Sequence, residues 1–489
     1  MRITIRYKMA KKQSSLKRNY IYNLLYRIVT LATPLITSPY ISRVLGAGGI
    51  GQYSYSYAIS HYFLIFAMLG VSEYGNREIA KNRDNIDDRN RVFTEILALQ
   101  VFLSVVIIFA YSIYVIFFAE LRFLALIQGL NIVAALFDIT WFLFGMELFL
   151  VTTLRNVAVK IASVILILVI VKKPEDVWLY AVIMAGSTLV GNLSVIPVLR
   201  KRVSIVKVRG KDVFRHLKPN FILFLPSIAN NLLGYFDKIM IGNISGDVEL
   251  GCYDNAEKML SIPNSLITAL GTVMLPHVSN SIARGETENV KKLTERSMLF
   301  VLFATFALVF GITGVAKEFV PFFFGNGYDL VIPLIYALAP YIVFVSWANV
   351  LKTQILLPNG KDRTYVICLI SGACANIVLN YILIPRYGAI GAAVATTFAE
   401  GIIAVLETIA LRGKCDTKKY IMQGIPFAAF GIGMFAVIYH IRIDNMLLAL
   451  LIKICIGATI YLALSGSYLL LFHRDLLKVL IPRKKDVKE

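Results

Sequence analysis

Cations recur within stretches of the chain that are otherwise apolar. Arg27 follows Asn23 by four residues and precedes Thr30 and Pro34, a spacing that places all four side chains on one face of a helix. A charge inside hydrocarbon costs at least about 2.5 kcal/mol, so one that persists usually faces a partner or a wet cavity. Arginine binds phosphate well because its guanidinium fork matches the oxygens. This face therefore predicts an anion site, unless Arg27 only reaches toward the membrane surface or pairs with an acid.

Other apolar stretches carry further cations at different depths. Arg27, Arg155 and Lys160 are expected in the inner half of the membrane, whereas Arg43, Lys238 and Lys258 are expected near its outer side. This distribution suits an anion that is met first on one side and then on the other. The predicted binding residues are Asn23, Arg27, Arg43, Arg155, Lys160, Asn231, Lys238 and Lys258.

Acidic side chains within the same stretches leave two interpretations open. They either bind a coupling ion, H⁺ or Na⁺, or pair with a neighbouring cation. An ion pair between Asp138 and Lys160 would have a purely structural role, and Glu407 is either a proton site or a charge that faces the cytoplasm. The predicted ion-coupling or ion-pair residues are Asp138, Asp237, Glu257 and Glu400.

Enzyme motifs do not account for these residues. The spacing Gly46-x-Gly48-x-x-Gly51 resembles a dinucleotide fingerprint, but it follows a long apolar helix rather than a short strand. We interpret it as a tight turn between two membrane spans. The five cysteines lack metal-ligand spacing. We therefore expect no catalytic residues, no metal and no cofactor.

The elements that hold the polar residues are predicted membrane helices. Of the 489 residues, 57% are hydrophobic and 16% are charged, against about 25% charged in a typical soluble domain. About fourteen apolar runs of roughly 20 residues recur, each long enough to cross a bilayer as a helix. They are 19–42, 51–74, 92–118, 123–145, 148–171, 177–199, 219–243, 251–277, 295–320, 329–353, 364–385, 388–411, 420–441 and 446–472. The fold class is an all-α polytopic membrane protein.

The net charge of +20 follows the topology. Most Lys and Arg residues fall in the segments that alternate spans place on one side, among them 200–218. This positive-inside asymmetry predicts that both termini are cytoplasmic, and it makes a nucleic-acid partner unnecessary. The segment 200–218 is then a cytoplasmic linker that also meets anionic membrane lipid.

A weak internal sequence repeat divides the chain into two halves. "GIGQYSYSYAIS" (49–60) aligns with "ELGCYDNAEKML" (249–260), which matches Gly51 to Gly251 and Tyr53 to Tyr253. Each half holds six predicted spans, so both have the same orientation, as in parallel-repeat transporters. We predict an N-terminal lobe at 1–218, a C-terminal lobe at 219–412, and two extra helices with a tail at 413–489.

The chain resembles the polysaccharide-biosynthesis exporters, lipid-linked oligosaccharide flippases of the multidrug/oligosaccharidyl-lipid/polysaccharide superfamily. The stretches that carry the resemblance are "SPYISRVLGAGGIGQYSYSYAIS" (38–60), "GVSEYGNREIAKNRDN" (70–85), "DITWFLFGMELF" (138–149), "YFDKIMIGNISGDVELGCYDNAEKM" (235–259) and "LNYILIPRYGAIGAAVATTFAE" (379–400). The resemblance implies two six-helix lobes in a V around a cationic cavity in the bacterial cytoplasmic membrane. Arg27, Lys160 and Lys238 match its cavity cations.

The resemblance also implies a substrate and partners. The substrate would be an undecaprenyl-pyrophosphate-linked oligosaccharide, moved from the inner to the outer leaflet for surface polysaccharide synthesis. Polymerase and glycosyltransferases of the same pathway would be partners. Three alternatives stay open: a peptidoglycan-precursor flippase, a drug/cation antiporter of the same superfamily, and a scaffold without transport. A basic cavity disfavours the antiporter, because cationic drugs need acidic groups.

Overall fold

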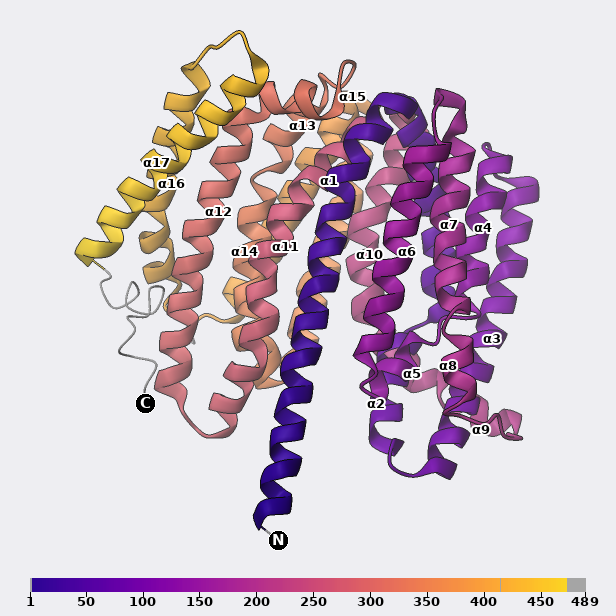
Figure 1. Ribbon diagram of the computed structural model, residues 1–489. Helices are drawn as coiled ribbons and strands as arrows, with labels where there is room; N and C mark the ends of the chain where they lie inside the picture. The colour runs from indigo at the N-terminus through magenta and orange to yellow at the C-terminus, as the bar shows by residue number, and fades with distance from the viewer. Residues whose placement is uncertain (1, 414, 473–489) are drawn as a thin grey trace. The chain divides into compact units, whose positions relative to one another are not determined.

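The chain is helical throughout the part that the structure describes. The computed structural model describes the backbone of residues 2–413 and 415–472, and the side chains among them except those of 2–28, 31, 226–227, 229–230, 232–233 and 272–273. Within these residues 87% of the structure is helix and no β-strand occurs (Figure 1). The predicted all-α class is confirmed. Backbone polar groups must be satisfied within each span, which helices achieve.

Contacts divide the chain into two compact units, with the boundary between Gly242 and Cys252. Unit 1 contains α1 (Arg2–Met68), α2 (Val71–Asn82), α3 (Ile86–Phe117), α4 (Arg122–Ala135), α5 (Thr140–Gly145), α6 (Phe149–Ile170), η1 (Pro174–Asp176), α7 (Val177–Leu193), α8 (Ile196–Arg200), α9 (Gly210–Phe214) and most of α10 (Leu217–Ser245). The predicted functional lobes stay a prediction.

Unit 2 contains Asn243–Ser245 at the end of α10, and from Cys252 onward it contains the remaining helices. They are most of α11 (Asp247–Ala283), α12 (Thr287–Phe324), α13 (Val331–Leu338), α14 (Tyr341–Leu351), the π-helix η2 (Lys352–Leu356), η3 (Leu357–Asn359), α15 (Asp362–Ala410), α16 (Thr417–His440) and α17 (Met446–Phe472). The hairpin of α16 and α17 packs on α12 (Figure 1). Lys453 of α17 is 2% exposed and donates to Glu318 of α12 at 2.6 Å, which ties the hairpin to the unit.

Eleven helices of the described chain are long and apolar enough to cross a membrane. Two of them join predicted neighbours: Ala32–Asn82 takes in 51–74 and the last part of 19–42, and Asp362–Ala410 takes in 364–385 and nearly all of 388–411. The predicted span 219–243 lies in α10. Every predicted run therefore lies largely in a helix, while the count of fourteen crossings stays a prediction.

Glycines bend the two joined helices. Gly46 in α1 has φ 68° and ψ 174°, and Gly388 in α15 has φ 57° and ψ −140°. Positive φ is readily available only to glycine, so these residues allow the chain to turn between spans. The predicted turn over Gly46–Gly51 was too long, because the chain deviates from helix at Gly46 and residues 47–51 are helical.

The two repeated segments around Gly51 and Gly251 are in close contact with each other within unit 1. A Cβ built on Gly51 would lie 1.8 Å from the carbonyl oxygen of Asp247, and one built on Gly251 would lie 1.9 Å from that of Ala47. Each glycine thus packs against the start of the helical segment that contains the other. The matched glycines are needed because no side chain fits between the two backbones.

Candidate functional site

An aromatic–lysine cluster forms in unit 1 where α1 and α10 approach. We define it as Tyr57 and His61 of α1 with Asn231, Tyr235 and Lys238 of α10. Tyr57 and His61 are four residues apart, and Asn231, Tyr235 and Lys238 follow at steps of four and three. These spacings place each set on one helix face. Two predicted binding residues, Asn231 and Lys238, are therefore brought together.

The contacts within the aromatic–lysine cluster are close. The rings of His61 and Tyr235 lie 4.2 Å apart, and that of Tyr57 lies 5.5 Å from His61 and 6.1 Å from Tyr235. His61 Nε2 lies 3.3 Å from Asn231 Oδ1, and Lys238 Nζ lies 5.7 Å from the centre of the Tyr235 ring. All five side chains are partly exposed. The cluster combines ring faces, an amide and an ammonium group, which suits a ligand that carries both sugars and an anion.

Lys160 lies on α6 of the same unit without an ion-pair partner among the described residues. Its side chain is partly buried. A lysine within a span normally pairs or faces water, so Lys160 is available to an anion. Its role in binding stays a prediction.

Arg155 bridges α6 and α7. It donates to Asn156 Oδ1 at 2.9 and 2.6 Å, and to the Gly191 carbonyl and Asn192 Oδ1, both at 3.5 Å. These contacts give Arg155 a structural role, because they tie neighbouring helices together.

The alternative of an Asp138–Lys160 ion pair is wrong. Asp138 follows the end of α4, where its Oδ1 accepts from the Thr140 backbone N–H at 3.0 Å and from the Thr140 hydroxyl. No ion pair to Lys160 occurs among the described side chains. Asp138 therefore organises the turn before α5, which sequence reasoning missed because it treated 123–145 as one continuous span.

The remaining predicted residues are dispersed. The side chains of Asn23 and Arg27 lie outside those that the structure describes, and Arg43 of α1 is exposed. In unit 2, Lys258 pairs with Asp254 of the same helix, so its cation is already neutralised.

The predicted ion-coupling acids divide between the units. Asp237, 1% exposed, acts electrostatically on Tyr62 in unit 1. Glu257 and Glu400 both act on Tyr341 in unit 2. The coupling roles of these three acids stay predictions.

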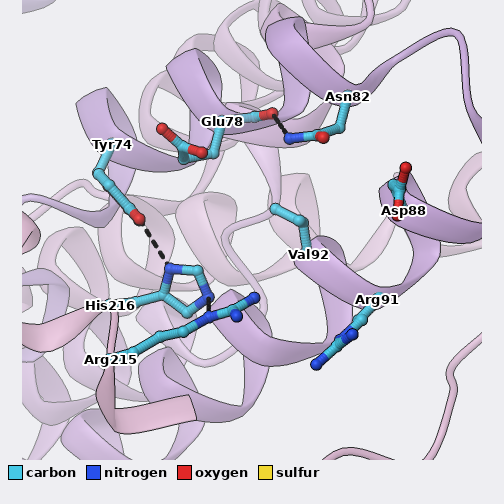
Figure 2. A pocket seen from close by; sticks show the side chains of 8 residues that line it. All are labelled: Tyr74, Glu78, Asn82, Asp88, Arg91, Val92, Arg215 and His216. Carbon is cyan, nitrogen blue, oxygen red and sulfur yellow. Dashed lines mark hydrogen bonds between the residues drawn. The ribbon is translucent and has the colours of Figure 1, made fainter. Parts of the chain in front are cut away.

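A polar pocket of about 430 Å³ lies in unit 1 between α2, α3 and the residues that precede α10. Figure 2 shows Tyr74 and His216 pointing toward each other, with Arg215 beside the histidine. The pocket is lined by Tyr74, Glu78, Asn82, Asp88, Arg91, Val92, Arg215 and His216.

Glu95 contacts three of the side chains that line this pocket. Its side chain is 0% exposed and accepts from Arg91 Nε at 2.9 Å, from Arg215 Nη2 at 2.5 Å and from His216 Nε2 at 2.8 Å. Tyr74 OH lies 2.7 Å from His216 Nδ1. In the tautomer whose Nε2–H donates to Glu95, Nδ1 accepts from the Tyr74 hydroxyl. The network joins α2, α3 and the start of α10 through buried groups.

The sequence from 16 to 282 matches the family described as polysaccharide biosynthesis protein. The match covers more than half of the chain. The chain belongs to the polysaccharide biosynthesis protein family. The expected resemblance is thus confirmed at the level of the family.

Relatives and solved structures extend the match over most of the chain. A protein named "Putative O-antigen transporter" from Escherichia coli strain K12 is 23% identical over 413 residues, which are 83% of this chain and 98% of that protein. Its namesake from Shigella dysenteriae is 20% identical over 401 residues, covering 81% and 100%. A lipid II flippase MurJ in an inward closed conformation shares the fold, with a TM-score of 0.73, 15% identity and coverage of 94% and 99%. These similar proteins are transporters or flippases and not enzymes, as predicted.

Several buried polar residues of this family member were missed in the sequence. Gln100 is 0% exposed, donates to the carbonyls of Ala135 and Asp138 at 2.5 and 3.0 Å, and accepts from Trp141 at 2.9 Å. Glu95 and His216 were also overlooked. A signal existed, because glutamate and glutamine inside apolar spans need partners, but the partners lie far away in sequence.

Proposed function

We propose that this protein is a flippase that moves undecaprenyl-pyrophosphate-linked oligosaccharides from the inner to the outer leaflet of the bacterial cytoplasmic membrane. The aromatic–lysine cluster carries the proposal. Its rings would stack on sugars, while Lys238, with Lys160 and Arg27, would bind the diphosphate. The polyprenyl tail would stay in lipid. Membership of the polysaccharide biosynthesis family supports this chemistry.

The proposed cycle is alternating access. Binding groups become reachable from one side of the membrane and then from the other, and the diphosphate exchanges one set of cations for the next. A potential that is negative inside favours outward movement of the anion. The gain is about 2.3 kcal/mol per charge per 100 mV, provided that protein charges do not move back equally. An ion gradient, H⁺ or Na⁺, would reset the empty carrier, and pathway enzymes such as a polymerase would use the product.

A second candidate is a peptidoglycan-precursor flippase. The fold shared with the lipid II flippase over 94% of the chain favours it. Both substrates carry sugars on a polyprenyl diphosphate, so the two functions need similar cations and ring surfaces. Reconstituted protein given each lipid separately would discriminate between them.

Replacing Lys160 with methionine tests the cation requirement. Hydrogen bonds to charged groups contribute about 1.5–3 kcal/mol, so Lys160→Met is expected to lower flipping of a lipid-linked oligosaccharide in proteoliposomes at least about tenfold. The matched control is Lys207→Met, because Lys207 is exposed in the linker that precedes α9. Normal flipping by the double variant Lys160→Met/Lys238→Met would refute the proposed cation site.

Replacing Tyr235 tests the sugar contact. Tyr235→Leu removes the ring that lies 4.2 Å from His61 and is expected to lower flipping severalfold, whereas Tyr235→Phe keeps the ring and most of the rate. Tyr381→Leu is the control, because Tyr381 is 75% exposed on α15. Competition by free oligosaccharide against the wild type and each variant would report binding directly. Equal competition in all of them would contradict a role for the ring.

A further inference from the structure

Glu407 of α15 is a carboxyl group buried within unit 2. Its side chain is 0% exposed, and neither Oε1 nor Oε2 has a hydrogen-bond partner among the described residues. An isolated carboxylate in an apolar interior is very costly, and such a group normally binds a proton or meets a counter-charge. Glu407 thus needs a neutralising partner that is absent from its immediate contacts.

Three titratable groups, Lys352, Glu400 and Cys368, interact electrostatically with Glu407. Lys352 at the start of η2 acts electrostatically on Glu407 and on Glu400, and Cys368 lies near enough to experience the charge of Glu407. No ion pair joins Lys352 to Glu407 within the described part of the chain. The Lys352 ammonium lies 5.4 Å from the centre of the Tyr365 ring. Lys352 is thus a cation near Glu407 that is not bonded to it.

The element packed against α15 has an unusual backbone and unpartnered polar groups. Residues 352–356 form a π-helix, a form found frequently at functional sites. Gln354 on this π-helix is 0% exposed, and both its amide atoms lack partners among the described residues. Ser346 on the adjoining α14 is 1% exposed, and its hydroxyl is likewise unpartnered there. Donors and acceptors of this kind suit a proton path.

We propose that Glu407 is a proton-binding site whose proton is taken up and released during transport, with Lys352 stabilising the carboxylate once the proton has left. On release the O–H bond of the carboxyl group breaks, the proton passes to water, and the electron pair stays on the Glu407 oxygens. A proton is favoured over Na⁺ because the lysine charge repels a metal cation. The coupling role rests on the proposed flippase function, whereas the protonation of Glu407 does not.

Infrared difference spectroscopy tests the protonation independently of transport. Purified protein in lipid nanodiscs is compared at low and high pH, in H₂O and D₂O. The wild type is expected to show a protonated-carboxyl band that is lost as pH rises, and Glu407→Gln is expected to lack it. Glu318→Gln is the control, because Glu318 already pairs with Lys453. A band that persists unchanged in Glu407→Gln overturns the proposal.

Lys352→Met provides a second variant should Glu407→Gln fold poorly. Without the neighbouring cation the carboxylate is less stable, so the band is expected to persist to a pH higher by about one unit. An unchanged titration of the band would refute the role of Lys352.

A transport assay distinguishes the coupling role of Glu407 from its protonation. In proteoliposomes with an imposed pH gradient, wild-type flipping is expected to change severalfold and Glu407→Gln flipping to be insensitive to the gradient. A variant that keeps the gradient response overturns the coupling role. If the wild type moves no lipid-linked oligosaccharide but the Glu407 band titrates, the proposed substrate is refuted and the proton site is supported.

Discussion

Alanine in place of Gly251 is expected to prevent accumulation of folded protein. The added Cβ would lie 1.9 Å from the carbonyl oxygen of Ala47, far inside van der Waals contact. The backbone fixes the position of the Cβ, and the oxygen is itself a backbone atom, so neither can rotate away, and the helical segments must separate. Overpacking of a well-packed interior typically costs about 1–3 kcal/mol and sometimes more. A backbone clash belongs at the upper end of that range.

The reciprocal geometry makes the prediction sharper. Gly51→Ala meets the Asp247 carbonyl at 1.8 Å and is expected to fail in the same way. Gly48→Ala is the matched control: it lies in the same helical segment, and the nearest atom to its Cβ is Val248 Cγ2 at 3.8 Å. Monodisperse yield from detergent extracts and the midpoint of thermal unfolding measure the effect. Equal yields for all three variants would contradict the close approach.

The structural role of Gly51 and Gly251 could be predicted only in part from the sequence. The echo of Gly51 and Tyr53 in Gly251 and Tyr253 indicated a repeat. Pattern alone did not show that each glycine packs against the segment that contains its counterpart, because a repeat does not specify contacts between its copies. A glycine in a sequence can serve a turn or a close approach of two backbones, and the carbonyl that each of these glycines approaches lies about 200 residues away.

Apolar runs predicted the helices well, because a span of about 20 residues has few alternatives within a bilayer. Polar side chains were predicted less well. Lys238 and Asn231 could be selected because their helical spacing was visible within one segment. Glu95, His216 and Gln100 could not, since their partners come from separate helices and local spacing carries no information about them. The turn that Asp138 organises was missed because a helix end inside an apolar run leaves little trace in hydropathy.

Removing the carboxyl group of Glu95 is the second change with a large expected effect. Glu95→Ala leaves His216, whose side chain is 5% exposed, without the carboxylate that its Nε2 contacts. It also removes one ion pair from Arg215 and one from Arg91, which keeps its pair with Asp212 at 3.5 Å. The two arginines are 54% and 49% exposed, so water compensates most of their loss. The buried histidine is not compensated, and the space left by the side chain adds to the cost. We expect about 3 kcal/mol of destabilisation, toward the lower end of that for breaking a buried ion pair.

Glu78→Ala is the matched control for Glu95→Ala. Glu78 lines the same pocket but pairs with Lys81 at 2.6 Å, and the lysine is 53% exposed. Exposed pairs contribute about 0–1 kcal/mol, so the loss should be small. Tyr74→Phe tests whether the contacts of Glu95, His216 and Tyr74 depend on one another. If Glu95 stabilises α2 through His216, Tyr74→Phe should lower the free energy of unfolding by less in the Glu95→Ala variant than in the wild type. Independent, additive losses in this double-mutant cycle would show that α2 is held by packing around Val71 and Ile79 instead of by the histidine network.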